Sequence, residues 1–164
     1  MTHKHVILKA RVLECSHSAI WSSALYEWAP VDVWHRPNGQ CTCTHTPIHK
    51  HTLIYNRVTN AELVIGSSCI KKFLSMPEVE EFFQCALRLS KDPSGHLASS
   101  FLAAGIGWNL LTRWEKGFLQ ITYPKKAAAL SEKQLAIRTK LTERILGYYH
   151  ATTHRRTQFT LTHA

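Results

Sequence analysis

Residues 41–73 decide the fold of this chain, and they read CTCTHTPIHKHTLIYNRVTNAELVIGSSCIKKF. The segment opens with Cys41 and Cys43, and a third cysteine, Cys69, lies near its end. In a C-x-C sequence both side chains leave the same side of an extended backbone, so a neighbouring bend can bring both sulfurs to one metal ion. Residues 37–39, Pro-Asn-Gly, supply a strong turn signal directly before the pair.

A hairpin and a helix are predicted between and after these cysteines. Residues 52–58 and 62–65 are rich in β-branched and apolar side chains, and Asn60 between them suits a left-handed turn position. Residues 66–68, Gly-Ser-Ser, then provide a break and a helix cap, so we expect Cys69 in the first turn of a helix. The positive end of the helix dipole favours the thiolate form that zinc requires.

The sequence therefore predicts a structural zinc ion, Zn²⁺, bound by Cys41, Cys43 and Cys69. The candidates for the fourth ligand are Cys15, His45, His49 and His51. His49 and His51 flank a strand and are expected to face solvent, so Cys15 and His45 lead. Cys15 would complete a four-cysteine set, whereas His45 is local and continues the alternation of the pair. A cysteine pair, a hairpin and a ligand at a helix start form the outline of a treble-clef zinc finger.

The composition fits a cytoplasmic protein. The 164 residues are 45% apolar, and no run approaches the roughly 18 to 20 apolar residues of a membrane span. The N-terminal segment lacks the features of a secretory signal. Five cysteines, an odd number, favour metal ligands or free thiols over disulfides. The free thiol is the expectation for Cys85, which lies beside Phe82 and Phe83 in a helical segment.

Residues 41–73 also resemble a motif of small phage and prophage proteins, C-x-C-G-x-x-x-I, then N-x-x-T-G, then G-x-x-C-x-x-x-F. The matching residues are Cys41, Cys43, Ile48, Asn56, Thr59, Gly66, Cys69 and Phe73. The chain departs from the motif at Thr44 and Asn60, where the pattern has glycine, although Asn tolerates the left-handed conformation that glycine would supply. The resemblance covers about a fifth of the chain. It implies a phage origin and a metal-binding, treble-clef-like unit, but no reaction.

A net charge of +9 favours polyanionic partners, nucleic acid foremost. Four basic residues lie in the metal-binding segment, and three more share a narrow arc of the last predicted helix, where they could follow a phosphate backbone. These candidate nucleic-acid contacts are Lys50, Arg57, Lys71, Lys72, Lys133, Lys140 and Arg144. We expect a non-enzymatic zinc protein that binds DNA or another nucleic acid, with the metal as scaffold.

Two other functions stay open at this point. One is a protein-interaction module whose basic surface meets an acidic host enzyme. The other is a metal-dependent nuclease built from His45, His49, His51 and Asn56. The nuclease is disfavoured, because three cysteines and a fourth protein ligand would leave the zinc no open position for substrate.

The rest of the chain completes an α+β expectation. We predict a strand at 6–12, a short helix over 20–28 capped by Ser16 or Ser18 and ended by Pro30, and helices at 77–89, 99–111, 112–119 and 130–150. Ser131 and Gln134 have the capping-box spacing at the start of the last helix. The last helix would bury Gln134, Ile137, Leu141, Ile145 and Tyr149. Residues 1–76 would form the zinc-binding unit, 77–150 a helical region packed on it, and 151–164 a tail with a short strand at 158–161.

Overall fold

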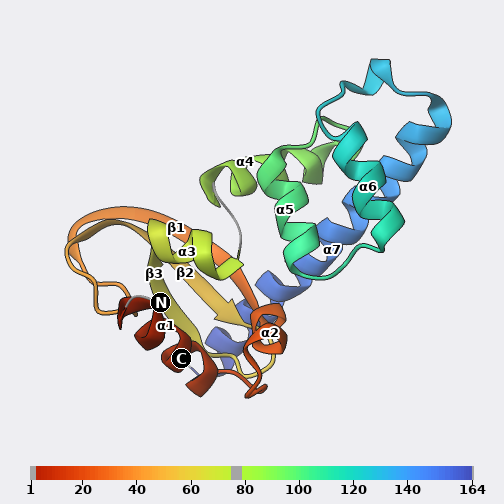
Figure 1. Cartoon of the computed structure of the whole chain (residues 1–164). Coiled ribbons are helices and arrows are strands. Elements are labelled where there is room, and N and C mark those ends of the chain that lie inside the picture. Colours follow the sequence, from red (N-terminus) through yellow and green to blue (C-terminus); the bar gives the residue numbers. More distant parts are fainter. Residues whose placement is uncertain (1–2, 75–78, 164) are drawn as a thin grey trace. The chain divides into compact units, whose positions relative to one another are not determined.

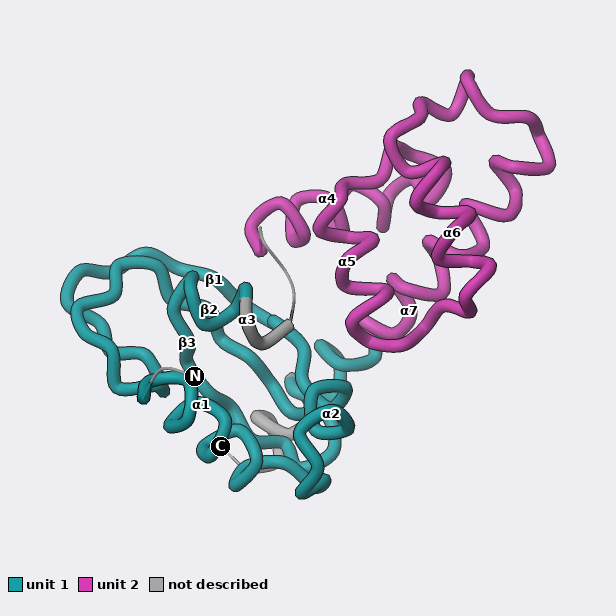
Figure 2. Tube along the Cα trace, in the orientation of Figure 1, with its two compact units in different colours: residues 1–75, 151–164 teal, residues 76–150 magenta. Residues whose placement is uncertain are grey.

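The computed structural model describes residues 3–74 and 79–163, and within these the side chains of 72–74 and 157–163 lie outside the description. The chain divides into two compact units (Figure 2). Unit 1 comprises residues 1–75 together with 151–164, and unit 2 comprises residues 76–150. Helices accompany one small antiparallel sheet, which confirms the α+β class (Figure 1). In the described ranges, no helix combines the length and apolar character needed to cross a bilayer.

Unit 1 is built on a three-stranded antiparallel sheet in the order β1-β2-β3. The strands are β1 (Trp28–Gly39), β2 (Ile48–Asn56) and β3 (Glu62–Gly66). The predicted hairpin is confirmed, and Asn60 turns it with a φ of 63°. Helix α3 (Ser67–Leu74) follows directly and contacts β2 and β3. The start of β2, the end of β3 and the start of α3 therefore lie at the same end of the sheet.

The strand predicted at 6–12 is wrong, because this segment lies in helix α1 (His3–Glu14). Leu8 and Val12 are buried, whereas Val6 is 51% exposed and Ala10 is also exposed. A strand would place all four side chains on one face. Burial at every fourth residue is the helical spacing, and it overrides the β-branched composition.

The helix predicted over 20–28 is shorter than expected. It consists of α2 (Trp21–Ala24) and a 3₁₀ turn, η1 (Leu25–Glu27), and β1 already begins at Trp28. Neither predicted cap is used, since Ile20 occupies the N-cap position and makes no side-chain cap hydrogen bond. Pro30 lies inside β1, next to a break in the strand register, where a missing N–H is tolerated.

Glu27 and Asn56 hold the far end of the sheet together. The Glu27 carboxylate accepts hydrogen bonds at 2.8 Å from the backbone N–H groups of His17 and Ser18 and from Asn56 Nδ2. Burial alone would raise the pKa of Glu27, but the bonds from Asn56, His17 and Ser18 outweigh it and lower that pKa. Asn56 Oδ1 accepts from the N–H groups that follow β2. The buried Asn56 side chain thus joins η1, directly before β1, to the β2–β3 turn.

Unit 2 contains α4 (Val79–Lys91), α5 (Ser99–Gly107), α6 (Arg113–Thr122), the 3₁₀ turn η2 (Ala127–Ala129) and the first part of α7 (Glu132–His163). The predicted helices are confirmed, although residues 77 and 78 of the first prediction lie outside the described residues. Asn109, with a φ of 56°, ends α5 four residues earlier than predicted, as a left-handed residue at a helix C-terminus does. Ser131 and Gln134 make the predicted capping-box bonds at the start of α7.

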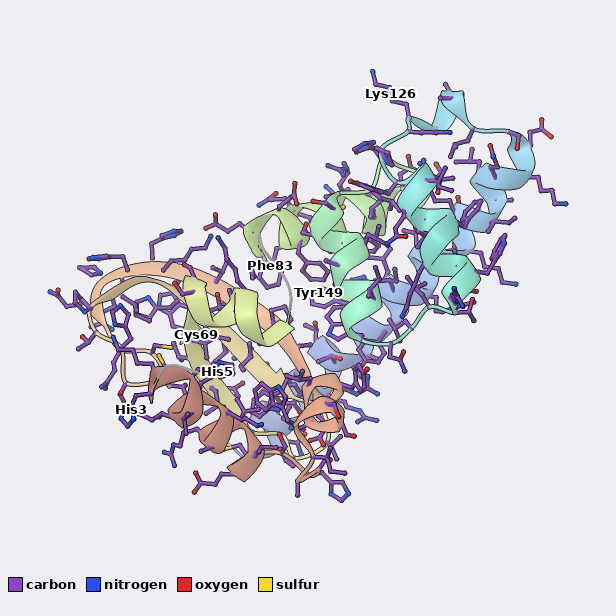
Figure 3. The ribbon with its side chains drawn as sticks, viewed as in Figure 1. His3, His5, Cys69, Phe83, Lys126 and Tyr149 are labelled. Atoms are coloured by element: carbon purple, nitrogen blue, oxygen red, sulfur yellow. The ribbon has the colours of Figure 1, made fainter. Side chains whose placement is uncertain are left out.

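Aromatic side chains and one buried arginine form the interior of unit 2. The ring of Phe82 stands edge-on to those of Trp108 and Tyr149, at centroid distances of 5.6 and 5.1 Å. Figure 3 shows Tyr149 beside Phe83, whose ring centroid lies 6.2 Å away. Arg138 is fully buried, and its Nη1 donates to the carbonyls of Thr122 and Lys125 at 2.9 and 2.7 Å.

The predicted buried stripe of α7 is partly wrong. Leu141 and Ile145 are buried, but Gln134 is exposed, and Arg138 and Thr142 occupy interior positions instead. Arg138 can be buried because it donates to carbonyls from unit 2 segments, which supply the acceptors that a guanidinium requires.

The predicted tail is also wrong, since α7 continues to His163 and the strand at 158–161 does not form. Thr152 is 2% exposed. Arg155 Nη1 donates to the carbonyl of Arg57 at 2.8 Å, and Arg156 forms an ion pair with Glu62. These contacts tie the last turns of α7 to the β2–β3 turn of unit 1.

Candidate metal centre

Three cysteines lie close together at the end of the sheet where β1 terminates. Cys41 and Cys43 lie in the bend between β1 and β2, and Cys69 is the third residue of α3. All three sulfurs lie within 4.8 Å of one another, and the Cys43 and Cys69 sulfurs are 3.4 Å apart. Cys41 and Cys43 are 3% and 2% exposed. Three soft ligands in a buried cluster could hold a metal ion.

The bend around the pair is a hydrogen-bonded knuckle. The Thr44 N–H donates to the Cys41 carbonyl at 2.8 Å, and the Cys41 N–H donates to the His45 carbonyl at 3.0 Å. Thr42 anchors the knuckle to β3, because its N–H and its hydroxyl both donate to the Val64 carbonyl. The turn predicted at residues 37–39 does not form, because β1 continues to Gly39. Asn38 nevertheless has a φ of 59°, and the strand register is irregular between His35 and Gly39. Thr44 also adopts a positive φ, 70°, which is unfavourable for a β-branched residue.

The junction of β3 and α3 delivers the third sulfur. The N–H of Gly66, the last residue of β3, points at Cys41 Sγ from 3.3 Å. A side chain at this position would crowd Ile48, because an added Cβ would lie 3.2 Å from Ile48 Cγ2. Cys69 then occupies the first turn of α3, where free N–H groups favour an anionic sulfur. The prediction that Cys69 lies at a helix N-terminus is confirmed.

The cluster is arranged to hold negative charge on sulfur. The hydrogen bond from Cys69 lowers the pKa of Cys41 to about 5, against the opposing effect of burial, and the N–H groups of Cys43 and Gly66 add to the lowering. The pKa of Cys69 is raised, first because its thiol proton is held by Cys41 and then by burial. Cys41 therefore ionises before Cys69 without metal, and a bound cation would displace the remaining protons.

A cavity of about 450 Å³ opens beside the sulfurs, and three histidines line it: His5, His45 and His49. His45 is exposed, and its Nδ1 lies 2.7 Å from Lys4 Nζ. His5 comes from α1 and lines the same cavity as Cys69. Both residues are labelled in Figure 3. His5 was not among the predicted ligands, because a strand was predicted directly after it, at residues 6–12, where α1 forms instead. The helical spacing of the buried Leu8 and Val12 was the available signal.

Cys15, the other proposed fourth ligand, is not brought to the cluster. Its carbonyl accepts a hydrogen bond at 2.7 Å from the Thr59 hydroxyl in the β2–β3 turn, at the opposite end of the sheet. Cys85 also lies apart, buried in α4, where the Ala98 N–H donates to its sulfur. Burial raises the pKa of Cys85, as expected for an inert thiol. Among the described residues, no other cysteine, histidine, aspartate or glutamate joins the three-sulfur group.

The basic residues predicted in unit 1 differ in their surroundings. Lys50 lines the cavity beside the cysteines, and Lys71 is exposed on α3. Arg57 lies at the far end of the sheet, where its carbonyl accepts from Arg155. The side chain of Lys72 lies outside the described residues.

The basic residues predicted in unit 2 lie on α7. Lys133 and Lys140 are exposed. Arg144 is already engaged, because its Nη1 donates to both carboxylate oxygens of Glu115 at 3.0 and 2.9 Å and to the Leu110 carbonyl at 3.2 Å. Arg144 thus fixes the start of α6 to α7 rather than standing ready for a phosphate.

The residues considered for a nuclease do not converge. His49 is exposed near the start of β2, whereas Asn56 is the buried last residue of that strand, roughly 23 Å away at about 3.3 Å per residue. The Asn56 amide is occupied by Glu27 and the β2–β3 turn. His51 was expected to face solvent, but it is 5% exposed and stacks on Trp34 at 5.3 Å.

Comparison with known proteins gives no relative: no family model, curated protein or solved structure matches the chain.

Proposed function

We propose that this chain is a zinc protein in which a cysteine-bound ion supports a basic surface that binds nucleic acid. The convergence of Cys41, Cys43 and Cys69, with all sulfurs within 4.8 Å, carries the proposal. Sulfurs at about 2.3 Å from a tetrahedral zinc lie roughly 3.8 Å from each other, so the cluster needs little movement to accept the ion. Thiolates favour zinc over magnesium or calcium, which take oxygen ligands.

The fourth ligand in this proposal is a histidine of the cavity, His5, His45 or His49. Three cysteines and one histidine form a closed tetrahedral set, which gives the metal a structural role and leaves it no open position for catalysis. The knuckle, the β2–β3 hairpin and α3 would then form the treble-clef-like unit implied by the phage-protein resemblance.

The charge of unit 1 supports nucleic acid as the partner. This unit carries ten Lys or Arg against four Asp or Glu. Glu27 is buried, while Glu14 and Glu62 form ion pairs with Arg11 and Arg156. Two of the four acidic groups are thus paired with arginines, and the net charge of the unit is positive.

The same imbalance holds beside the metal ligands. Lys4 and Lys50 line the cavity together with the three histidines, and no carboxylate of the described residues does. Lys71 stands exposed two residues after Cys69 on α3. A phosphate backbone passing over this end of the sheet would contact cations from α1, β2 and α3.

The test is a salt-dependent titration of zinc-loaded protein into labelled single-stranded and duplex DNA, followed by fluorescence anisotropy. We expect affinity to fall steeply with salt, and the double variant Lys50→Gln, Lys71→Gln to lower the slope by up to about 0.9 per lost duplex phosphate contact. Lys91→Gln, an exposed cation on α4, is the matched control and should leave the slope unchanged. Absence of binding even at low salt would reject nucleic acid as the partner.

A further inference from the structure

Helix α6 presents an apolar face to solvent. Trp114 and Ile121 are 63% and 66% exposed, and Gly117 and Phe118 lie between them on the same side of the helix. The spacing of these four residues is i, i+3, i+4 and i+7, which gathers them into one stripe. Large side chains at such exposure cost free energy in water, so a stripe of them is typical of a binding surface.

The stripe forms a shallow hollow with a flat aromatic wall. The rings of Trp114 and Phe118 stack at 5.3 Å with an interplanar angle of 16°. Together with Arg113, Gly117 and Ile121 they line a hollow of about 640 Å³. An added Cβ at Gly117 would meet nothing within 4 Å, so the floor of the hollow is open.

Both ends of α6 are fixed by hydrogen bonds. At its start, Thr112 and Glu115 form a capping box, and Glu115 also pairs with Arg144. At its end, the carbonyls of Thr122 and Lys125 accept from the buried Arg138. The aromatic wall is thus presented on a preorganised helix, which lowers the entropic cost of binding.

The charges around the hollow indicate the chemistry of the occupant. Arg113 lines it, Lys116 lies on the adjoining flank of the helix, and Lys125 is exposed just beyond the helix end. Within the part of the chain that the structure describes, no carboxylate lines the hollow, and Glu115 is directed to Arg144. A purely apolar partner would gain nothing from these cations. An occupant that combines flat apolar groups with regular negative charge satisfies both features.

We propose that α6 binds single-stranded nucleic acid, with an unpaired base stacked on Trp114 and phosphates beside Arg113 and Lys116. This inference rests on the proposed nucleic-acid binding and adds a stacking site in unit 2 and a preference for unpaired bases. Stacking of this kind tolerates any sequence, because every base has a π-face. A duplex keeps its bases paired and cannot use the aromatic wall.

The experiment measures binding of the full-length, zinc-loaded chain to a labelled oligothymidylate and to a duplex of equal length. Trp114→Ala should weaken single-strand binding roughly five- to hundredfold, and Trp114→Phe should restore most of the affinity. Arg113→Gln should lower the single-strand salt slope by about 0.7. Leu87→Ala, which removes another exposed apolar side chain of unit 2, is the matched control and should bind as the wild type does.

The outcomes separate the two proposals. If the wild type binds neither probe, the proposed function fails, and this inference fails with it. If the wild type binds but Trp114→Ala retains full single-strand affinity, only the inference is overturned. Equal losses on single strand and duplex would also overturn it, as would concentration-dependent self-association that Trp114→Ala abolishes without changing DNA affinity. Equal melting temperatures of the variants confirm that folding is not the cause.

Discussion

Replacing Asn56 by Asp probes the buried link between η1, directly before β1, and the β2–β3 turn. Asn56 is fully buried, and its Nδ2 donates to Glu27 Oε2 at 2.8 Å. Its Oδ1 accepts from the N–H groups of Val58 and Thr59 at 2.8 and 2.9 Å. Asn56→Asp keeps the shape and the accepting oxygen, but it turns the donor into a carboxylate oxygen facing a second carboxylate.

The cost follows from the need for one shared proton. Two carboxylate oxygens at this distance cannot both stay ionised, so the folded variant must bind a proton that the unfolded chain has released. Holding that proton three pH units above a pKa of about 4 costs about 4 kcal/mol at about 1.4 kcal/mol per unit. We therefore expect Asn56→Asp to lose about 3–4 kcal/mol of folding stability at pH 7 and only about 1–2 kcal/mol at pH 5.

The direction of the pH dependence distinguishes the variant from the wild type. The pKa of Glu27 is lowered in the folded wild type, so its contribution is present above the unfolded pKa and is lost as the pH falls through the folded pKa. In Asn56→Asp the shared proton raises the pKa of the carboxyl pair. The contribution of that pair is present below the unfolded pKa and is lost as the pH rises.

The assay is urea unfolding at pH 5 and pH 7, followed through the indole N–H resonance of Trp28, which reports on unit 1 by donating to Ser16 Oγ at 2.9 Å. Asn56→Ala, measured at each pH, removes the amide without adding a carboxyl group. Comparison with it cancels any effect of pH on the metal ligands. A stability difference between Asn56→Asp and Asn56→Ala that is the same at both pH values would refute the shared-proton argument.

Three further substitutions test the packing of each unit by urea unfolding. Thr44→Gly should stabilise unit 1 by about 0.5–1 kcal/mol, because glycine adopts the positive φ of this position without steric cost, and a decrease would contradict the strain argument. Gly39→Ala should cost about 1–3 kcal/mol, since the added Cβ would lie 1.7 Å from His51 Nε2, and an unchanged midpoint would show that the ring moves freely. Glu115→Ala should lower the stability of unit 2 by about 1 kcal/mol through loss of the capping box and the Arg144 pair. Glu115→Gln keeps the accepting oxygen and should lose less, so equal losses in the two variants would contradict the capping argument.

Sequence predicted the parts of unit 1 whose signals are local. Asn60 marks the hairpin turn, because asparagine tolerates the left-handed conformation found there. The Gly-Ser-Ser break places Cys69 in the first turn of α3. Three of the proposed ligands could therefore be recognised from turn and cap chemistry alone.

The error at α1 had a different cause. Leu8 and Val12 fit both a strand and a helix in sequence, since four residues are two strand repeats and about one helical turn. Whether the segment forms a helix or a strand depends on which residues of the folded chain cover Val6 and Ala10. The local sequence does not contain that information. With α1 assigned to a strand, His5 could not be recognised as a neighbour of the cysteines.

The positions of Cys15 and Arg138 also depend on contacts between segments that are far apart in the sequence. Composition made Cys15 a reasonable fourth ligand, but the register of the hairpin places it beside Thr59, at the other end of the sheet. Arg138 was not among the residues predicted to be buried. It is buried because carbonyls from two separate segments, around residues 94 and 122–125, converge on its guanidinium, which no local pattern reveals.

Metal content tests the central claim most directly. The protein would be purified without added metal, and zinc per chain would be measured by mass spectrometry in the wild type and in Cys41→Ser, Cys69→Ser, Cys15→Ser and Cys85→Ser. We predict one zinc per chain in the wild type, Cys15→Ser and Cys85→Ser, and loss of zinc in Cys41→Ser and Cys69→Ser. A wild type without metal, or full zinc content in Cys69→Ser, would contradict the assignment of the cysteine cluster as a zinc site.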